Sequence, residues 1–151
     1  MSGEAIQVFD GTPTTVISGT GSLAAANFST SGTATETEFD NSADKWPMAK
    51  AVLSCSYSSA PAAGKTVDLY MFEQDIDGTN DEAGPTTTAQ QGAKYVGSFR
   101  LYNTTSQQYK AINISLAGVR KAKFAIYNGS VNAMDSDFTL KLEGWSTAPA
   151  A

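Results

Sequence analysis

The chain has 151 residues, of which 41% are hydrophobic and 17% are charged, and its formal net charge is -5 at pH 7. This length fits one domain with its own core, and the negative charge disfavours binding to a phosphate backbone. Histidine is absent, which excludes Ser-His-Asp triads, Cys-His pairs and His-ligated zinc. The single cysteine, Cys55, excludes an internal disulfide and lies in an apolar strand pattern, where we expect a buried small hydrophobe.

The N-terminal part of the chain is predicted to be extended. Residues 4–9 and 14–18 are short strand candidates separated by the turn DGTP, and residues 19–45 are rich in Gly, Ser, Thr and Ala. A stretch with so few large apolar side chains can gain order by lying on another subunit. We therefore expect residues 1–45 to be an extended, partner-contacting segment. We expect neither a secretory signal, because the first residues lack a basic region, nor a membrane span of roughly 20 apolar residues.

From Trp46 to Trp145, apolar side chains recur with a period of two, which predicts β-strands separated by Gly, Asn, Asp and Pro turns. The candidate strands are residues 48–57, 66–72, 94–102, 109–116, 121–128 and 138–145. This spacing predicts an all-β fold, an antiparallel β-sandwich that is jelly-roll-like, with about eight strands and an extended N-terminal segment. We expect residues 46–145 to form the sandwich and residues 146–151 a frayed tail, in one domain overall.

The same alternation assigns faces to the strands. The side chains expected in the core are Ala49, Ala51, Leu53, Cys55, Tyr57, Val67, Leu69, Met71, Tyr95, Phe99, Leu101, Ile112, Ile114, Leu116, Ala122, Phe124, Ile126, Phe138, Leu140 and Leu142. Trp46 precedes Pro47, which fixes the chain just before a strand, and we expect its indole to plug one end of the sandwich.

The most acidic stretch is YMFEQDIDGTNDEAGP, residues 70–85. Its candidate calcium ligands are Asp75, Asp77, Asp81 and Glu82. An EF-hand register fails here, because Gly78 is the fourth residue from Asp75 rather than the sixth, and Thr86 stands where a bidentate acid is needed. We favour a solvated loop tip, in which Asp, Asn and Gly adopt turn conformations. No metal and no cofactor is expected.

Catalysis by paired carboxylates needs a cleft and apolar surroundings for the proton donor. Acids at one loop tip supply neither, so we expect no catalytic residue and no enzymatic activity. Some aromatic residues fall at strand ends or on the polar phase of the strands, where they could stack on sugar rings or contact a neighbouring subunit. They are Tyr57, Tyr70, Tyr102, Tyr127 and Trp145, and the candidates for such a contact are Tyr70, Tyr102, Tyr127 and Trp145.

Several segments, together with the polar N-terminal third, carry a family resemblance: DKWPMAKAVLSCSYSSAPAAGKTVDLYMF, YVGSFRLYNTTSQQY, KFAIYNGS and DFTLKLEGW. Over most of residues 44–145 the chain resembles the small, cysteine-poor, all-β virion proteins of tailed bacteriophages. The resemblance implies a structural role, either in capsid decoration or in a tail or fibre. Decoration proteins of that kind often sit as trimers on the capsid lattice, and some are thought to bind carbohydrate.

The resemblance and the residue patterns together favour a non-enzymatic capsid decoration protein, made in the host cytoplasm and located in the virion. Its expected partners are further copies of itself, as a trimer, and a major capsid or other virion protein. Two alternatives stay open: a tail or fibre component, and a carbohydrate-binding β-sandwich module. Neither nucleic acid nor a membrane is expected as a partner.

Overall fold

Ten β-strands and no helix make up the part of the chain that the computed structural model describes, residues 5–149. This part therefore contains no helix that is long and apolar enough to cross a membrane. The strands are β1 (Ala5–Phe9), β2 (Thr14–Gly19), β3 (Ala34–Glu36), β4 (Phe39–Asp40), β5 (Met48–Cys55), β6 (Thr66–Gln74), β7 (Lys94–Arg100), β8 (Gln108–Ser115), β9 (Lys121–Asn128) and β10 (Thr139–Pro149).

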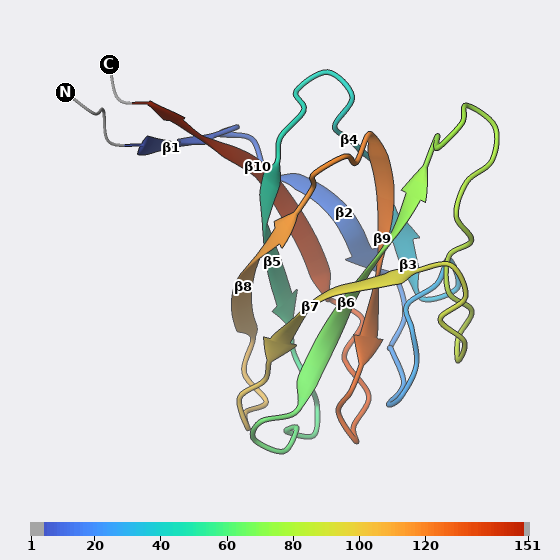
Figure 1. The fold of residues 1–151 in the computed structure, drawn as a ribbon. Coiled ribbons are helices and arrows are strands. Elements are labelled where there is room, and N and C mark those ends of the chain that lie inside the picture. Colours follow the sequence, from blue (N-terminus) through green and yellow to red (C-terminus); the bar gives the residue numbers. More distant parts are fainter. Residues whose placement is uncertain (1–4, 150–151) are drawn as a thin grey trace.

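The strands form two antiparallel sheets that pack face to face (Figure 1). One is six-stranded, with the order β3-β2-β10-β5-β8 and with β1 added to β10; the other is four-stranded, with the order β4-β9-β6-β7. Without β1 and β3, the remaining eight strands form the two sheets β2-β10-β5-β8 and β4-β9-β6-β7. This is the strand order of a jelly roll. The predicted jelly-roll-like β-sandwich is confirmed, and its eight strands are supplemented by β1 and β3.

The core lies between the two sheets, and the predicted alternation supplies most of it. Leu53, Leu69, Phe124 and Leu140 have no exposed surface, and they come from β5, β6, β9 and β10 in turn. β5 buries every second side chain against the opposite sheet, as a pleated strand with one covered face must, and β6 and β9 do the same while also burying Phe72 and Ala125 in a second, smaller cluster. The indole of Trp46 packs against this core at Gly144, where an added Cβ would lie within 3 Å of the ring.

Residues 14–45 belong to the sandwich, which differs from the expectation of an extended segment reaching to residue 45. Val16 and Ile17 of β2 are fully buried, and β2 pairs with β10 inside the six-stranded sheet. Leu23 is buried too and forms an isolated bridge with Met134. A few apolar side chains suffice because they pack into a core that the other strands already form, so the Ser- and Thr-rich residues between them can face solvent.

The projecting segment is shorter and combines the two ends of the described chain. β1 pairs with residues 145–149 of β10, whereas the pairing of β10 with β5 ends at Trp145 and Met48. The resulting two-stranded β1–β10 ribbon, residues 5–9 and 145–149, extends away from the sandwich (Figure 1). Residues 146–149 are therefore a paired strand rather than the expected frayed tail, and residues 150–151 of that tail lie outside the described residues.

A buried asparagine joins the loops at the end of the sandwich where β9 ends. Asn128 is fully buried, and its Nδ2 donates to the carbonyl oxygens of Leu23 at 3.0 Å and Asn132 at 2.9 Å. Its Oδ1 accepts from the buried Tyr57 hydroxyl at 2.9 Å and from the Ser130 amide at 3.2 Å. Four polar groups therefore share one side chain as a partner, although the Leu23 carbonyl oxygen also accepts from the Met134 amide at 2.8 Å.

We predict that Asn128→Ala lowers the free energy of unfolding by about 2–4 kcal/mol, because several buried groups lose their partner at once. Urea denaturation followed by circular dichroism measures the loss. The matched control is Asn113→Ala on the exposed face of β8, which should change stability by less than about 0.5 kcal/mol. A loss for Asn128→Ala no larger than the control's contradicts the role assigned to this side chain.

Cys55 is fully buried in the core, as its strand pattern predicts. Burial disfavours the thiolate and, with a contribution from the negative charge of Asp137, raises the pKa of Cys55 to about 12. We predict that at pH 8 Ellman's reagent labels the folded protein at least about a hundredfold more slowly than the urea-unfolded protein. Similar labelling rates in the two states would contradict a buried thiol.

Candidate functional site

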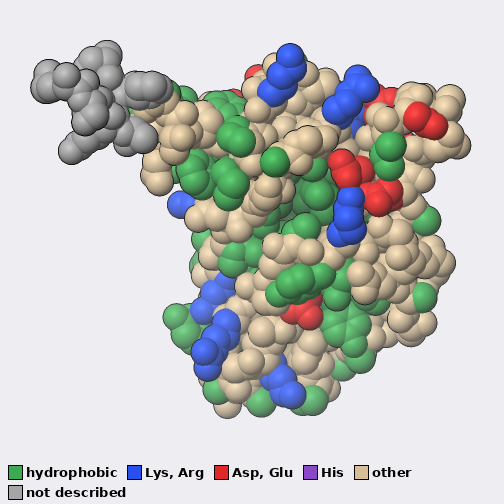
Figure 2. All heavy atoms as spheres, in the orientation of Figure 1, with side chains coloured by type: hydrophobic (Ala, Val, Ile, Leu, Met, Phe, Trp, Pro, Cys, Tyr) green, Lys and Arg blue, Asp and Glu red, His purple; other side chains and the backbone are tan. Residues whose placement is uncertain are grey.

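A candidate surface site lies on the outer face of the four-stranded sheet, which faces the viewer in Figures 1 and 2. Tyr70 of β6 is in register with Tyr95 of β7, and the neighbouring Asp68 is in register with Tyr127 of β9. We call Tyr70, Tyr95 and Tyr127 the tyrosine cluster. Figure 2 shows hydrophobic side chains exposed across this face.

Ring packing holds the tyrosine cluster together. The Phe28 ring, from the loop between β2 and β3, lies 5.1 Å from that of Tyr70 and 4.8 Å from that of Tyr127. The ring centroids of Tyr70 and Tyr95 are 5.8 Å apart in an edge-to-face arrangement. Phe28 is buried, whereas 57% of Tyr95 is exposed. The outermost ring of the cluster therefore presents a face to solvent on a support of packed aromatic side chains.

Polar groups border this aromatic surface. Asp68 Oδ1 accepts hydrogen bonds from Thr66 Oγ1 at 2.9 Å and from Ser98 Oγ at 2.7 Å, and the Tyr95 hydroxyl lies 2.6 Å from the same Ser98 oxygen. Burial, followed by the charge of Asp68, raises the pKa of Tyr70, so this phenol stays protonated and can donate. An aromatic face beside a carboxylate and hydroxyl groups is a combination that can bind a polyhydroxylated ring.

A bulge brings Tyr95 to this face. The register of β6 and β7 runs Leu69 to Gly97 and then Tyr70 to Tyr95, so Val96 is an extra residue in β7. The period-two prediction placed Tyr95 in the core with Phe99; this is correct for Phe99 and wrong for Tyr95. The sequence signal was the glycine inside the strand, because a glycine in a strand interior often marks a bulge.

The four aromatic residues singled out from the sequence do not form one site. Tyr70 and Tyr127 meet through Phe28. Tyr102 lies beyond the end of β7, 65% exposed, with Lys110 Nζ over its ring. Trp145 lies at the base of the β1–β10 ribbon beside Phe9, with ring centroids 6.2 Å apart.

The acidic stretch begins in β6 and continues, from Asp75 onward, as a loop at the end of the molecule where acidic and basic side chains gather in Figure 2. The Asn80 side-chain amide donates to Asp77 Oδ2 at 2.6 Å, and the main-chain amides of Asn80 at 2.6 Å and Thr79 at 3.0 Å donate to Oδ1. These bonds, led by that from the Asn80 side chain, lower the pKa of Asp77 to about 2. Asp81 Oδ1 accepts from the Asp75 amide at 2.6 Å. Such bonds are typical of Asx turns.

The remaining acids of this loop have basic or main-chain partners. Glu82 accepts from the Glu73 amide at 2.7 Å, and Lys94 forms ion pairs with both Glu73 and Glu82. Hydrogen bonding to Glu73 is the main cause of a raised pKa of Lys94. Within residues 5–149, no three acidic or cysteine side chains converge in an arrangement that could hold a metal ion, so the candidate calcium ligands Asp75, Asp77, Asp81 and Glu82 do not form a joint site there.

No protein-family model matches this sequence, and no curated protein matches it. Among solved structures, the chain is similar to "CBM35 from Cellvibrio japonicus Abf62", with 14% identity and a TM-score of 0.42 over 98% of this chain and 99% of that one. It is also similar to "Xyl-CBM35 in complex with glucuronic acid containing disaccharide", with 14% identity and a TM-score of 0.41 over 97% of this chain and 98% of that one. At this level of similarity, neither structure identifies a function or a site residue of this chain.

Proposed function

We propose that this chain is a non-enzymatic structural protein of a virion, most simply a capsid decoration protein, that assembles through the β1–β10 ribbon. The observation that carries the proposal is the surface of this ribbon. Its apolar side chains Ile6, Val8 and Phe9 are 48%, 36% and 43% exposed. A two-stranded ribbon with such a surface has little to stabilise it alone, and it becomes stable when a partner covers it.

The main chain of the ribbon supports the same proposal. Among residues 5–149, β1 pairs with β10 alone and residues 146–149 of β10 pair with β1 alone, so within this part of the chain each strand has one unpaired edge. Soluble proteins usually protect such edges with charged side chains, yet residues 5–9 and 145–149 contain no charged residue. An added strand from a partner would satisfy these edges, and covering the exposed apolar side chains would contribute about 1 kcal/mol for each.

The virion context rests on the resemblance to bacteriophage virion proteins, with a tail or fibre position as the alternative to the capsid. It predicts that the gene lies beside genes for capsid or tail proteins. A genomic neighbourhood without any virion genes would contradict the virion assignment and leave assembly through the ribbon to be tested separately.

We predict that the double variant Ile6→Lys with Val8→Lys lowers the molar mass measured by light scattering from that of an oligomer to that of a monomer. Both side chains are exposed in the single chain, so the thermal melting of the variant should match that of the parent. The control, Asn113→Lys with Ser115→Lys, places the same two charges on exposed positions of the edge strand β8 and should leave the oligomer intact. A monomeric parent, or an oligomeric ribbon variant, would contradict assembly through the ribbon.

The tyrosine cluster favours a second candidate function, the binding of carbohydrate. The exposed Tyr95 ring can stack on a sugar, and the Asp68 carboxylate, which Ser98 holds in place by a hydrogen bond, can accept hydrogen bonds from sugar hydroxyls at its border. The proposed assembly uses the other sheet, so the two functions are compatible in one molecule.

We predict saturable binding to at least one sugar on a glycan array, with a loss of at least about tenfold in affinity for Tyr95→Ala and for Asp68→Asn. Tyr109→Ala is the matched control, because Tyr109 is a 71% exposed tyrosine on β8 of the other sheet. Binding that Tyr109→Ala weakens as much as Tyr95→Ala, or an array without any bound glycan, would sink this second function.

A further inference from the structure

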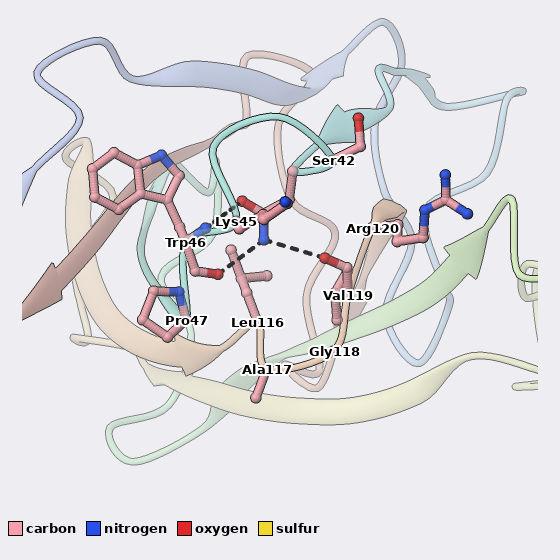
Figure 3. A pocket seen from close by; sticks show the side chains of 10 residues that line it. Ser42, Lys45, Trp46, Pro47, Leu116, Ala117, Gly118, Val119 and Arg120 are labelled. Atoms are coloured by element: carbon pink, nitrogen blue, oxygen red, sulfur yellow. Dashed lines mark hydrogen bonds between the residues drawn. The ribbon is translucent and has the colours of Figure 1, made fainter.

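A pocket of about 410 Å³ opens at one end of the jelly roll, between two turns (Figure 3). One turn, residues 41–47, leads from β4 into β5, and the other, residues 116–120, leads from β8 into β9. This volume falls within the range of pockets that bind small molecules. Neither the tyrosine cluster nor the β1–β10 ribbon contributes a lining residue.

Hydrogen bonds from one buried side chain fix the two turns relative to each other. Asn41 is 2% exposed, and its Nδ2 donates to the carbonyl oxygens of Trp46 at 2.9 Å and Val119 at 3.2 Å. Its Oδ1 accepts from the Trp46 amide at 2.8 Å, and Figure 3 shows all three bonds as dashed lines. The Leu116 amide also donates to the Pro47 carbonyl oxygen at 2.8 Å. The pocket is therefore preformed, and a ligand need not order its walls.

The charge of the pocket is opposite to that of the whole chain. The sequence has 15 acidic and 10 basic residues, yet the lining includes Lys45 and Arg120 and no acid. Arg120 forms an ion pair with Asp75, whose Oδ2 lies 3.7 Å from Nη2, which is too long for a hydrogen bond and leaves the N–H groups of the guanidinium free to donate. Asp40, next to the lining, accepts at Oδ1 from the Ser42 amide at 2.9 Å and hydroxyl at 2.6 Å, and its charge interacts with Arg120 without a hydrogen bond between them. Both cations thus keep donors available for an anion.

The rest of the lining is largely apolar. Leu116 and Val119 are buried beneath the pocket, 1% and 8% exposed, and the Trp46 and Pro47 rings stand across from Arg120 in Figure 3. A ligand that matches this surface has an apolar ring face and one negative charge. A planar carboxylate suits a guanidinium better than a spherical anion does, because two parallel hydrogen bonds can form.

We propose that this pocket binds a small organic carboxylate, with its carboxylate at Lys45 and Arg120 and its ring on Trp46 and Pro47. The proposal is independent of the assembly and carbohydrate functions, because it shares no residue with either surface. The proposed ligand site lies at the end of the jelly roll, between the turn that joins β4 to β5 and the turn that joins β8 to β9. Elsewhere the net negative charge of the chain repels anions.

The test uses the full chain carrying Trp145→Phe, so that Trp46 is the only tryptophan that fluoresces. The probe is cyclohexanecarboxylate, and its neutral isostere cyclohexanecarboxamide is the control ligand. We expect a saturable change in Trp46 emission with the carboxylate below about 10 mM, and binding of the amide at least about tenfold weaker. No saturation, or equal binding of the two probes, overturns the proposal.

Two variants locate the charge contact. Arg120→Gln and Lys45→Gln should each weaken binding of the carboxylate by about tenfold, since each removes a charge-assisted hydrogen bond. Arg100→Gln, at an exposed arginine outside the pocket, is the matched control and should bind as the parent does. All three positions are exposed, so unchanged melting temperatures verify folding. Binding that both pocket variants retain at full strength overturns the proposal.

Discussion

Strand β10 determines the architecture because it pairs with different strands along its length. In residues 139–142 it lies between β2 and β5, and Leu140 and Leu142 are fully buried in the core. From Trp145 onward it pairs with β1 instead. Main-chain groups need partners wherever water is excluded, so the first half of β10 is held in place by its pairing with β2 and β5. The β1–β10 ribbon continues the same strand, and its direction therefore follows from that of the buried half.

This arrangement separates the proposed contacts on the molecule. The ribbon extends the six-stranded sheet and contains no charged residue, whereas the tyrosine cluster lies on the outer face of the four-stranded sheet. The pocket that Lys45 and Arg120 line is between two turns at one end of the jelly roll. A copy that docks through its ribbon can therefore still present its tyrosine cluster to solvent, which is the arrangement a decoration protein would need to bind sugars from the surface of a particle.

The positions of the strands, and the side chains that each strand turns toward the core, could be predicted from the sequence wherever the alternation was regular and the strand paired over its whole length. Residues such as Leu53, Leu69 and Phe124 follow the period of two and are buried as predicted. The N-terminal part could not be predicted in this way, because Leu23 enters the core through one isolated bridge to Met134 rather than through a periodic strand. Contacts between residues so distant in sequence leave no local pattern.

The candidate site shows the same division between local and long-range information. Tyr70 and Tyr127 were identified because each stands on the polar phase of its own strand. Their convergence depends on the register of β6 with β9 and on Phe28 from a distant loop. Tyr95 was misplaced because the bulge at Val96 shifts the phase of β7 by one residue.

The central claim is that the ribbon is incomplete until a partner covers it, and hydrogen exchange of its amides tests this most directly. Mass-resolved exchange on dilute, monomeric protein should show fast exchange in residues 5–9 and slow exchange in residues 140–144, where β10 lies inside the sandwich. At concentrations where the chain associates, residues 5–9 and 146–149 should become protected, while the exchange of residues 140–144 should not change. Equal protection of residues 5–9 in the dilute and the associated protein would contradict the account.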